Sequence, residues 1–292
     1  MLHNDKDNFL KTLETTSSQT GFPLLLLEKD YYLTVVLSGI NSLSEELIFK
    51  GGTCLNKIYY SYYRLSEDLD FTLRLPSDNF SRGAKRKAIK PIKDRILSYA
   101  DSYGMHVDDI KNTGRNESSQ YIFYIDYNSV VLETKQTIKL EIALRNNPLK
   151  ETSKQKVNHK FLHPFTAEPL FEGGEVNCLD IKELVAEKMR AAATRLTIAP
   201  RDFYDISFLI NAGFNFQDEQ LWQLFKAKLC EDDFEPELEK YRVNMGRSHD
   251  EIEDMGSRIE AELLDVLTPD ERRAFDLDKS IELLNKTFKI MK

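Results

Sequence analysis

Hydrophobic residues recur along the chain at two different spacings, which predict an α+β (mixed α/β) protein. A spacing of three to four residues, typical of a helix with one buried face, predicts helices at 5–20, 24–43, 53–62, 82–95, 180–196 and from 201 onwards. Alternating or short apolar runs predict strands at 47–49, 68–75, 121–127 and 137–144. We therefore expect a small mixed sheet with the N-terminal helices in residues 1–172. A helical C-terminal domain should follow in residues 173–292, beginning at the Gly173-Gly174 turn.

The strand predicted at 68–75 carries two carboxylates on one face. Asp68 and Asp70 are two residues apart, so they point to the same side, whereas Leu69 and Phe71 point to the other. Two carboxylates so close together are costly unless water or a cation lies between them. Oxygen-rich pairs of this kind suit Mg²⁺, so the pair is a candidate metal site.

A glycine pair lies between the strand predicted at 47–49 and the helix that follows it. Gly51 and Gly52 would let main-chain N–H groups approach a phosphate chain at the start of that helix, where the helix dipole also favours an anion. Lys57, on the same helix, is a candidate phosphate neighbour. A phosphate cradle beside a metal-binding carboxylate pair is the combination that nucleotidyl transfer requires.

The strand predicted at 137–144 carries a third carboxylate. Ile138, Leu140 and Ile142 share one face, and Glu141 lies on the other. In the simplest interpretation Glu141 is an exposed edge-strand glutamate that pairs with Lys139 or Arg145.

Two charged positions stand out in the helices after residue 180. Asp180 and Glu183 fit a capping box at the start of the first helix, and Lys188 lies within its apolar stripe. A bare ammonium there would be expensive, so either its stem reaches to water or its charge meets an anion. Pro200 ends this helix. Asp202 is then a candidate N-cap of the next one, and Asp205 lies near the same edge.

The composition is that of a soluble globular protein, with 41% hydrophobic and 30% charged residues in a chain of 292. No apolar run approaches the roughly 20 residues needed to span a bilayer, so we expect no membrane partner. Asp5 and Asp7 make the first residues unlike a secretory signal. Cys54, Cys178 and Cys230 are few and scattered, which favours reduced thiols in the cytoplasm.

The net charge of −8 is unevenly distributed. Residues 218–282 contain 20 acidic and 9 basic residues, a net charge of −11, which leaves +3 on the remainder. Residues 82–95, a helix bent or restarted at Pro91, carry seven cations and one acid. Solvated helix faces explain most such patterns. The alternative is that the basic helix contacts RNA or a triphosphate, while the acidic part contacts a protein partner.

The segment 145–163 is also basic, and we interpret it as a flexible loop near the substrate. His159 and His163 are four residues apart within it. The loop composition and Pro164 argue against a helical metal pair.

Four separated segments, taken together, carry a resemblance to a known family. They are Gly51-Gly52-Thr53 with Ser66 to Asp70, Ile138 to Ile142, Glu183 to Arg190, and Arg201 to Ile206. In this order they resemble the AbiEii/AbiGii-type toxins, which belong to the DNA polymerase β-like nucleotidyltransferase superfamily. The helical segment around Glu28 to Tyr31 also resembles the family's N-terminal part. The resemblance implies a polymerase β-like nucleotidyltransferase core.

The resemblance also implies roles for individual residues. Asp68 and Asp70 would hold Mg²⁺ (or Mn²⁺), and Glu141, as a third carboxylate on a neighbouring strand, would complete the set. Gly51, Gly52, Thr53 and Ser66 would contact the triphosphate of an NTP, as would Lys57. Lys188 would neutralise phosphate, and Asp205 would belong to the family's fourth motif, so that the C-terminal domain contributes both residues to the site.

The function expected from the resemblance is that of a Mg²⁺-dependent nucleotidyltransferase toxin in a toxin–antitoxin or phage-defence (abortive infection) system. It would transfer a nucleoside monophosphate from an NTP to an acceptor hydroxyl. The acceptor is hypothesised to be a tRNA 3′ end or another RNA, and the protein partner a cognate antitoxin. The alternatives are nucleotidylylation (AMPylation) of a protein hydroxyl, a non-catalytic nucleotide- or RNA-binding relative, and a metal-dependent nuclease.

Overall fold

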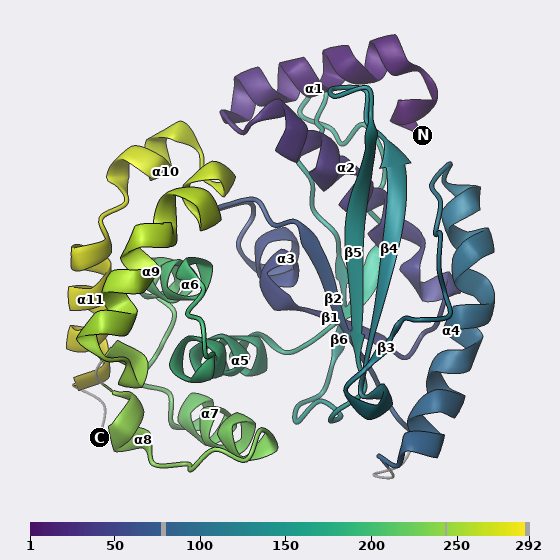
Figure 1. Cartoon of the computed structure of the whole chain (residues 1–292). Coiled ribbons are helices and arrows are strands. Elements are labelled where there is room, and N and C mark those ends of the chain that lie inside the picture. Colours follow the sequence, from purple (N-terminus) through teal and green to yellow (C-terminus); the bar gives the residue numbers. More distant parts are fainter. Residues whose placement is uncertain (77–79, 243, 290–292) are drawn as a thin grey trace. The chain divides into compact units, whose positions relative to one another are not determined.

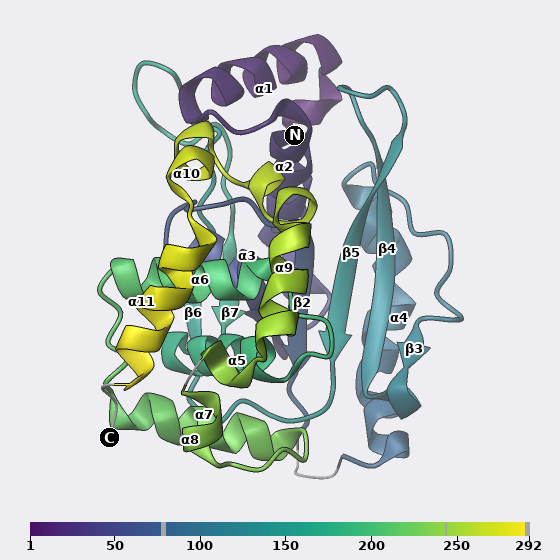
Figure 2. The same cartoon turned by 60° about the vertical axis from the view of Figure 1, so that its left-hand side comes forward.

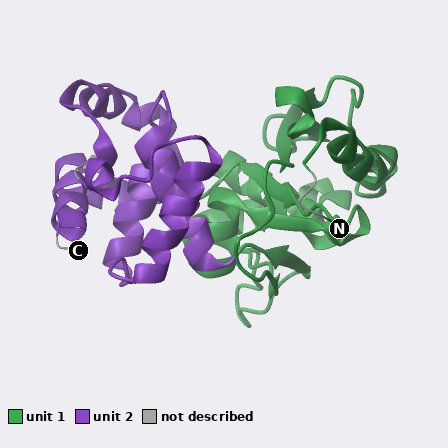
Figure 3. Cartoon of the chain, turned by 90° about the horizontal axis from the view of Figure 1, so that it is seen from below, with its two compact units in different colours: residues 1–179 green, residues 180–292 purple. Residues whose placement is uncertain are grey.

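The computed structural model describes residues 1–76, 80–242 and 244–289. Two compact units make up the chain, residues 1–179 and residues 180–292 (Figure 3). The division falls later than the glycine turn at Gly173-Gly174, because strand β7 (Glu175–Cys178) pairs with two other strands of the first unit.

The first unit is built on a mixed sheet, which has seven strands within the described residues (Figure 1). Their spatial order is β3-β4-β5-β2-β1-β7-β6. The bounds are β1 Leu47–Lys50, β2 Asp68–Leu73, β3 Gly114–Arg115, β4 Gln120–Asn128, β5 Lys135–Ala143, β6 Ser153–Lys156 and β7 Glu175–Cys178. The pairs β2–β5 and β1–β7 are parallel, and the other neighbours are antiparallel. The predicted strands at 47–49, 68–75, 121–127 and 137–144 are confirmed to within two residues at their starts and ends.

One face of this sheet is apolar and carries helices. Phe49, Phe71, Ile142 and Tyr121 lie side by side on successive strands, and all four are buried. Helices α2 (Leu24–Gly39) and α4 (Arg82–Ser102) pack on this side (Figure 1). Tyr32 of α2 stacks on Tyr127 of β4 with ring centroids 4.0 Å apart, and Tyr99 of α4 donates a hydrogen bond to Val36 O of α2. Helix α1 (Lys6–Thr20) packs in turn on α2.

The opposite face carries the polar residues of the same strands, because side chains alternate along a strand. Asp68, Asp70, Lys139 and Glu141 all lie there. The alternation predicted for these strands is therefore confirmed: Leu69 and Phe71 are buried on the helix-covered face, away from the two aspartates.

Three connecting segments differ from the sequence prediction. The helix after the glycines is shorter than 53–62 and consists of α3 (Gly51–Cys54) with a π turn at Leu55–Tyr59. The segment 112–120, which its composition predicts as a polar loop, contains the short edge strand β3, and 145–163 contains β6, so neither is simply a loop. His159 is buried against Phe171, its ring stacked at 4.1 Å and its Nε2 2.7 Å from Phe171 O, which makes it a packing residue.

A buried ion pair joins α2 to the π turn. Lys57 is completely buried, and its Nζ lies 2.6 Å from Asp30 Oδ1. The same ammonium donates to Thr34 Oγ1 at 2.8 Å and to the Tyr62 hydroxyl at 2.6 Å, and Tyr62 in turn donates to Asp30 Oδ2 at 2.8 Å. Burial lowers the pKa of Lys57, although the Asp30 charge opposes this. The expectation that Lys57 contacts phosphate is therefore corrected: its charge is enclosed and used within the core.

The second unit is helical. Its elements are α5 Ile181–Thr194, α6 Pro200–Asn211, α7 Glu219–Glu231, α8 Leu238–Tyr241, α9 His249–Glu262, α10 Pro269–Ala274 and α11 Leu277–Lys289. Helix α5 packs on α6 and α7, and α6 lies beside α9 and α11 (Figure 2). Trp222 makes edge contacts with Phe225 and Phe288, so these aromatic residues serve packing.

The start of α6 corrects one prediction. Pro200 occupies the first turn and Ala199 is the N-cap, so Asp202 is not a cap. Asp180, by contrast, does cap α5, accepting hydrogen bonds from the main-chain N–H groups of Lys182 and Glu183. The Glu183 carboxylate binds Lys228 Nζ at 2.8 Å.

Two further expectations concern the whole chain. Within the described residues, no disulfide involves Cys54, Cys178 or Cys230; the reduced state of these thiols stays an expectation. A search of the described helices finds no segment with the length and apolar character needed to cross a membrane.

The buried pair makes a direct prediction. Replacing Lys57 by Met would leave the Asp30 carboxylate buried without its cation, so the free energy of unfolding should fall by about 3–5 kcal/mol in urea denaturation. The matched control is Lys29→Met, because Lys29 pairs with Glu67 at 3.2 Å while both side chains are partly exposed. That change should cost less than about 1 kcal/mol. A loss for Lys57→Met as small as that of the control would contradict the assignment.

Candidate active site

A row of side chains crosses four strands on the polar face of the sheet, and the first three of them are charged. Lys50 of β1 is paired in register with Asp70 of β2, and Asp70 with Glu141 of β5. Ile122 of β4 is the next residue in the row. Directly paired residues on adjacent strands have Cβ atoms about 5 Å apart, so Asp70 lies between a cation and a second carboxylate.

A second, parallel row lies two residues along the strands. Asp68 of β2 is paired with Lys139 of β5, and Lys139 with Tyr124 of β4. The Tyr124 side chain is 55% exposed, so this end of the row is open. The two rows together bring Asp68, Asp70 and Glu141 onto one patch, with Lys50 and Lys139 as the cations between and beside them.

The glycine pair lies directly against this patch. Gly51 has a φ of +76°, and a Cβ built on it would lie 2.3 Å from Asp70 Oδ2. A Cβ on Gly52 would lie 2.6 Å from Nη2 of the buried Arg64. Both the backbone conformation and the close approach therefore require glycine at position 51, and the main chain there is in contact with the Asp70 carboxylate.

Thr53 and Ser66 tie the glycine turn to the start of β2. The Thr53 hydroxyl donates to Asp68 O at 2.5 Å and lies 2.8 Å from the Ser66 hydroxyl. Thr53 is buried and Ser66 partly exposed. These hydrogen bonds give both residues a positioning role, and their contact with a triphosphate stays a prediction.

The electrostatics of the row follow from its crowding. Burial, followed by the neighbouring charges of Glu141 and Asp68, raises the pKa of Asp70 to about 6, although Lys50 and Lys139 oppose the shift. Burial alone would raise the pKa of Glu141 as well. Hydrogen bonds from Lys139 Nζ at 2.8 Å and Gln120 Nε2 at 2.6 Å outweigh it and hold that pKa below its ordinary value.

Glu141 therefore combines features of both interpretations. It does pair with Lys139, but β5 lies between β4 and β2, so Glu141 is not on an edge strand. Its neighbour across the parallel pairing is Asp70. Glu141 is thus a third carboxylate beside Asp68 and Asp70, and it also forms an ion pair with Lys139.

The donor chemistry of the patch fits a divalent cation. Three carboxylates on adjacent strands repel one another, which the raised pKa of Asp70 reflects, and a cation would relieve that repulsion. Among the described residues no three Asp, Glu, His or Cys side chains are arranged as a ready metal cage. The Lys139 and Gln120 contacts of Glu141 would compete with a metal for the same oxygens. Metal binding by Asp68, Asp70 and Glu141 is thus a prediction supported by charge.

The second unit holds its own charged cluster. Lys188 Nζ of α5 lies 2.9 Å from Asp202 Oδ1 and 2.9 Å from Asp205 Oδ2, both on α6. Arg195 Nη1 lies 3.3 Å from Asp202 Oδ2. Asp205 is completely buried and Lys188 nearly so. The contacts of Lys188 agree with the second interpretation, in which its charge meets anions. These anions are the carboxylates of the next helix.

Some members of the patch are not evident from the sequence. Lys50 ends β1 and reads as an ordinary residue before a glycine turn, and Gln120 and Arg64 lie in segments that look polar and irregular. Only the strand register places Lys50 and Gln120 beside the carboxylates. Period-two alternation could have placed Lys50 on the same face as Ile48, but not beside Asp70.

These parts, in this order along the chain, match a known family. Residues 36–279 match the model of the nucleotidyl transferase AbiEii toxin of type IV toxin–antitoxin systems. The chain belongs to the AbiEii family. It is therefore a nucleotidyltransferase of the toxin–antitoxin type, as the resemblance predicted. Family membership also implies an NTP substrate and an antitoxin partner.

Solved structures support the fold. JHP933 from Helicobacter pylori has 17% sequence identity and a TM-score of 0.52, with 92% of each chain covered. MenT4, the nucleotidyltransferase toxin Rv2826c from Mycobacterium tuberculosis H37Rv, has 15% identity and a TM-score of 0.54, covering 92% of this chain and 84% of its own. No curated protein matches the sequence. The predicted α+β nucleotidyltransferase fold of the AbiEii protein is confirmed.

The raised pKa of Asp70 predicts a pH-dependent effect on stability. Between the ordinary value of 3.8 and about 6, the folded protein keeps a proton that the unfolded chain has lost, so stability falls as pH rises through this window. Above it the whole cost is present. Asp70→Asn cannot ionise, and at pH 8 it should be more stable than wild type by about 1–2 kcal/mol, a gain that fades towards pH 4.

The control for this experiment is a carboxylate whose pKa shift has the opposite sign. A hydrogen bond from Lys135 lowers the pKa of the exposed Asp108, so Asp108→Asn should not stabilise the protein at pH 8. Thermal melts at pH 8, 6 and 4 measure both variants. If Asp70→Asn changes the melting temperature equally at all three values, the charge crowding is not the cause.

Proposed function

We propose that this AbiEii protein transfers a nucleoside monophosphate from an NTP to an acceptor hydroxyl, using Mg²⁺ or Mn²⁺ held by Asp68, Asp70 and Glu141. The observation that carries the proposal is the contact of Gly51 with Asp70 beside Glu141, which combines a phosphate-approachable main chain with crowded carboxylates. Family membership supplies the reaction class, and the residues supply its arrangement.

The chemistry follows from these residues. The acceptor oxygen would attack the α-phosphorus, the bond from that phosphorus to the oxygen bridging to the β-phosphate would break, and pyrophosphate would leave as the acceptor hydroxyl loses its proton. A divalent cation bound to the carboxylates supplies neutralisation of the phosphate charge. With its pKa at about 6, Asp70 is ionised at neutral pH and available for this role. Positioning and neutralisation are the main demands of phosphoryl transfer, and no covalent enzyme intermediate is needed.

The remaining family motifs belong to the same proposal. Lys188 would neutralise phosphate, and to do so it would exchange part of its contact with Asp202 or Asp205 for the anion. Asp205 would then position Lys188 through the contact that it keeps. Gly52, Thr53 and Ser66 stay in the proposal as triphosphate neighbours, whereas Lys57 leaves it because its charge is enclosed.

The proposed acceptor is an RNA, most simply a tRNA 3′ end, and the proposed setting is phage defence by abortive infection in the cytoplasm. Support for RNA comes from the cations of α4, whose surface is described below. Modification of a protein hydroxyl is the competing acceptor.

The reaction has a direct test. Incubation with each α-labelled NTP, Mg²⁺ and total RNA or lysate should give labelled RNA, and Asp68→Asn and Asp70→Asn should each lower the rate at least about 100-fold, the scale expected when charge stabilisation is lost. Asp108→Asn is the matched control, since Asp108 is exposed and pairs with Lys135. It should react like wild type.

Each other outcome selects a different function. Label on protein instead of RNA would favour the protein-modifying alternative, and shortened RNA would indicate a nuclease. Tight NTP binding without pyrophosphate release would mark a non-catalytic relative. Label transfer that survives Asp70→Asn unchanged would remove the carboxylate patch from the reaction.

Glu141 predicts a specific dependence on metal. Because Glu141→Gln removes one of three carboxylates, the Mg²⁺ concentration for half-maximal rate should rise about tenfold, and saturating Mg²⁺ should restore most of the rate. Titration of activity with Mg²⁺ measures this. Asp108→Asn is the control, because that exposed carboxylate pairs with Lys135 and lies outside the patch. An unchanged half-maximal concentration for Glu141→Gln would exclude it as a metal ligand.

A further inference from the structure

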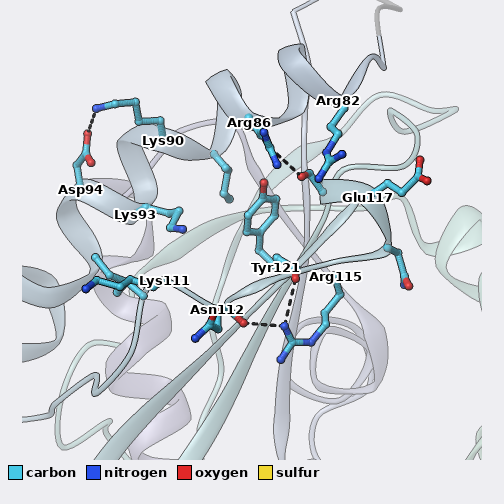
Figure 4. Close-up of a pocket in the computed structure, with 15 residues that line it drawn as sticks. Arg82, Arg86, Lys90, Lys93, Asp94, Lys111, Asn112, Arg115, Glu117 and Tyr121 are labelled. Carbon is cyan, nitrogen blue, oxygen red and sulfur yellow. Dashed lines mark hydrogen bonds and ion pairs between the residues drawn. The ribbon is translucent and has the colours of Figure 1, made fainter.

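A second charged surface lies away from the carboxylates, between α4 and the segment that contains β3 (Figure 4). It is a cavity of about 630 Å³, which we call the α4 pocket. The cations that line it are Arg82, Arg86, Lys90 and Lys93 on α4, with Lys111 and Arg115 facing them. The four α4 cations follow one another at three- or four-residue intervals, so they share one face of the helix.

The positive charge of the α4 pocket is only slightly compensated. Asp94 and Glu117 also line it, and Lys90 pairs with Asp94 at 2.7 Å. Within the described ranges, no ion pair to a carboxylate is found for Arg82, Arg86 or Lys93 on α4, nor for the two cations opposite. In a protein of net charge −8, such a cluster is a local exception. Clustered cations of this kind attract anionic partners.

Several of these side chains are held in place by neutral partners. Arg86 Nε donates to Ser118 Oγ at 3.4 Å, and Arg115 Nη1 donates to the carbonyl oxygens of Asn112 and Gly114 at 2.7 and 3.1 Å. The ammonium of Lys93 lies 6.0 Å from the ring centroid of Tyr121. Such contacts orient the cations without cancelling their charge.

The α4 pocket lies on the face of the sheet opposite to the carboxylates. Tyr121, in its wall, belongs to the helix-covered face. Its neighbour Ile122 faces the other way and is paired with Glu141. The pocket and the Asp70 carboxylate therefore lie on opposite faces of the sheet, which favours the RNA contact over a contact with a triphosphate bound at Asp70.

We propose that the α4 pocket binds the phosphate backbone of the acceptor RNA, at a distance from the reacting hydroxyl. The cations from 82 to 93 extend over about 16 Å of helix, and a duplex strand carries one phosphate per about 3.4 Å of its axis, so several phosphates fit along them. The exposed Asn112 amide adds a polar group of the kind that contacts phosphate and sugar oxygens. That this RNA is the acceptor rests on the proposed function, whereas the binding of RNA by the α4 pocket does not.

The two-faced arrangement restricts the RNA. Strand β4 lies two strands, about 10 Å, from β2, which carries Asp70. An RNA bound in the α4 pocket must therefore extend past the β3–β4 edge of the sheet to bring its hydroxyl to Asp70. A folded RNA of tRNA size can contact both faces, whereas a fragment of a few nucleotides reaches only one. Removing the pocket cations should therefore raise KM for intact tRNA and leave KM for a short 3′ fragment unchanged.

The test compares two double variants of α4 that remove the same charge. Arg82→Gln/Arg86→Gln removes cations of the pocket, and Lys85→Gln/Lys87→Gln removes cations of the same helix that do not line it. Binding of labelled tRNA without NTP is measured by fluorescence anisotropy from 50 to 200 mM salt. The pocket variant should bind about tenfold more weakly, with a salt slope smaller by about 1.4 to 1.8, and the control should match wild type. Melting temperatures of both variants establish that they fold.

The outcomes separate the two proposals. Weaker RNA binding by the pocket variant alone supports the α4 pocket, even if no nucleotidyl transfer is found. Active transfer with unchanged tRNA binding and KM in the pocket variant overturns the pocket and leaves the proposed function intact. Equal weakening by both double variants also overturns it, because the attraction would then belong to the whole helix. Unchanged tRNA binding together with lost binding of polyglutamate would assign the pocket to an acidic protein instead.

Discussion

The crowding of carboxylates on adjacent strands is the constraint on which this AbiEii protein depends. Register places Asp70 between Lys50 and Glu141, and it places Asp68 beside Lys139. Burial and like charge then raise the pKa of Asp70, and the two lysines limit the increase. An arrangement of this kind is destabilising in the absence of a counter-ion, so it is typical of a site that binds a cation or a reacting charge. The lysines limit the repulsion among the carboxylates, and they are also the groups with which a metal would compete.

The elements beneath this patch are fixed by strong local contacts. Gly51 contacts the Asp70 carboxylate, and the Thr53 hydroxyl donates a hydrogen bond to Asp68 O, so these contacts link the glycine turn to the start of β2. A few residues further on, the π turn is anchored to α2 by the buried Lys57–Asp30 pair. Replacing one partner of such a pair is costly, which makes the π turn rigid. The buried Lys57–Asp30 pair thus holds in place an element that directly follows the glycine turn.

The sequence predicts the features that depend on neighbours along the chain, but not those that depend on pairing between distant strands and helices. Alternation placed Asp68 and Asp70 on one face, since that rule involves only the strand itself. The same rule could not show that Glu141 lies beside Asp70, because register between strands about 70 residues apart is set by the assembled sheet. Lys57 was misassigned because its partner Asp30 lies on another helix. Asp202 is not the predicted N-cap, because the helix begins at Pro200 with Ala199 as its N-cap, three positions before Asp202, whose carboxylate binds Lys188 instead.

The sheet also separates the carboxylate patch from the cations of the α4 pocket, two groups of charges that would interfere on one face. Arginines and lysines near Asp68 and Asp70 would form ion pairs with them and occupy the oxygens that a metal needs. The α4 pocket instead lies behind an apolar layer that includes Phe71, Leu140 and Phe123, all buried. The pocket cations therefore lie across this apolar layer from the carboxylates. They still attract a polyanion from solution, because that attraction acts on the RNA before it reaches the site. Separation by the sheet would therefore let one small unit hold the proposed cation on one face and the proposed RNA phosphates on the other.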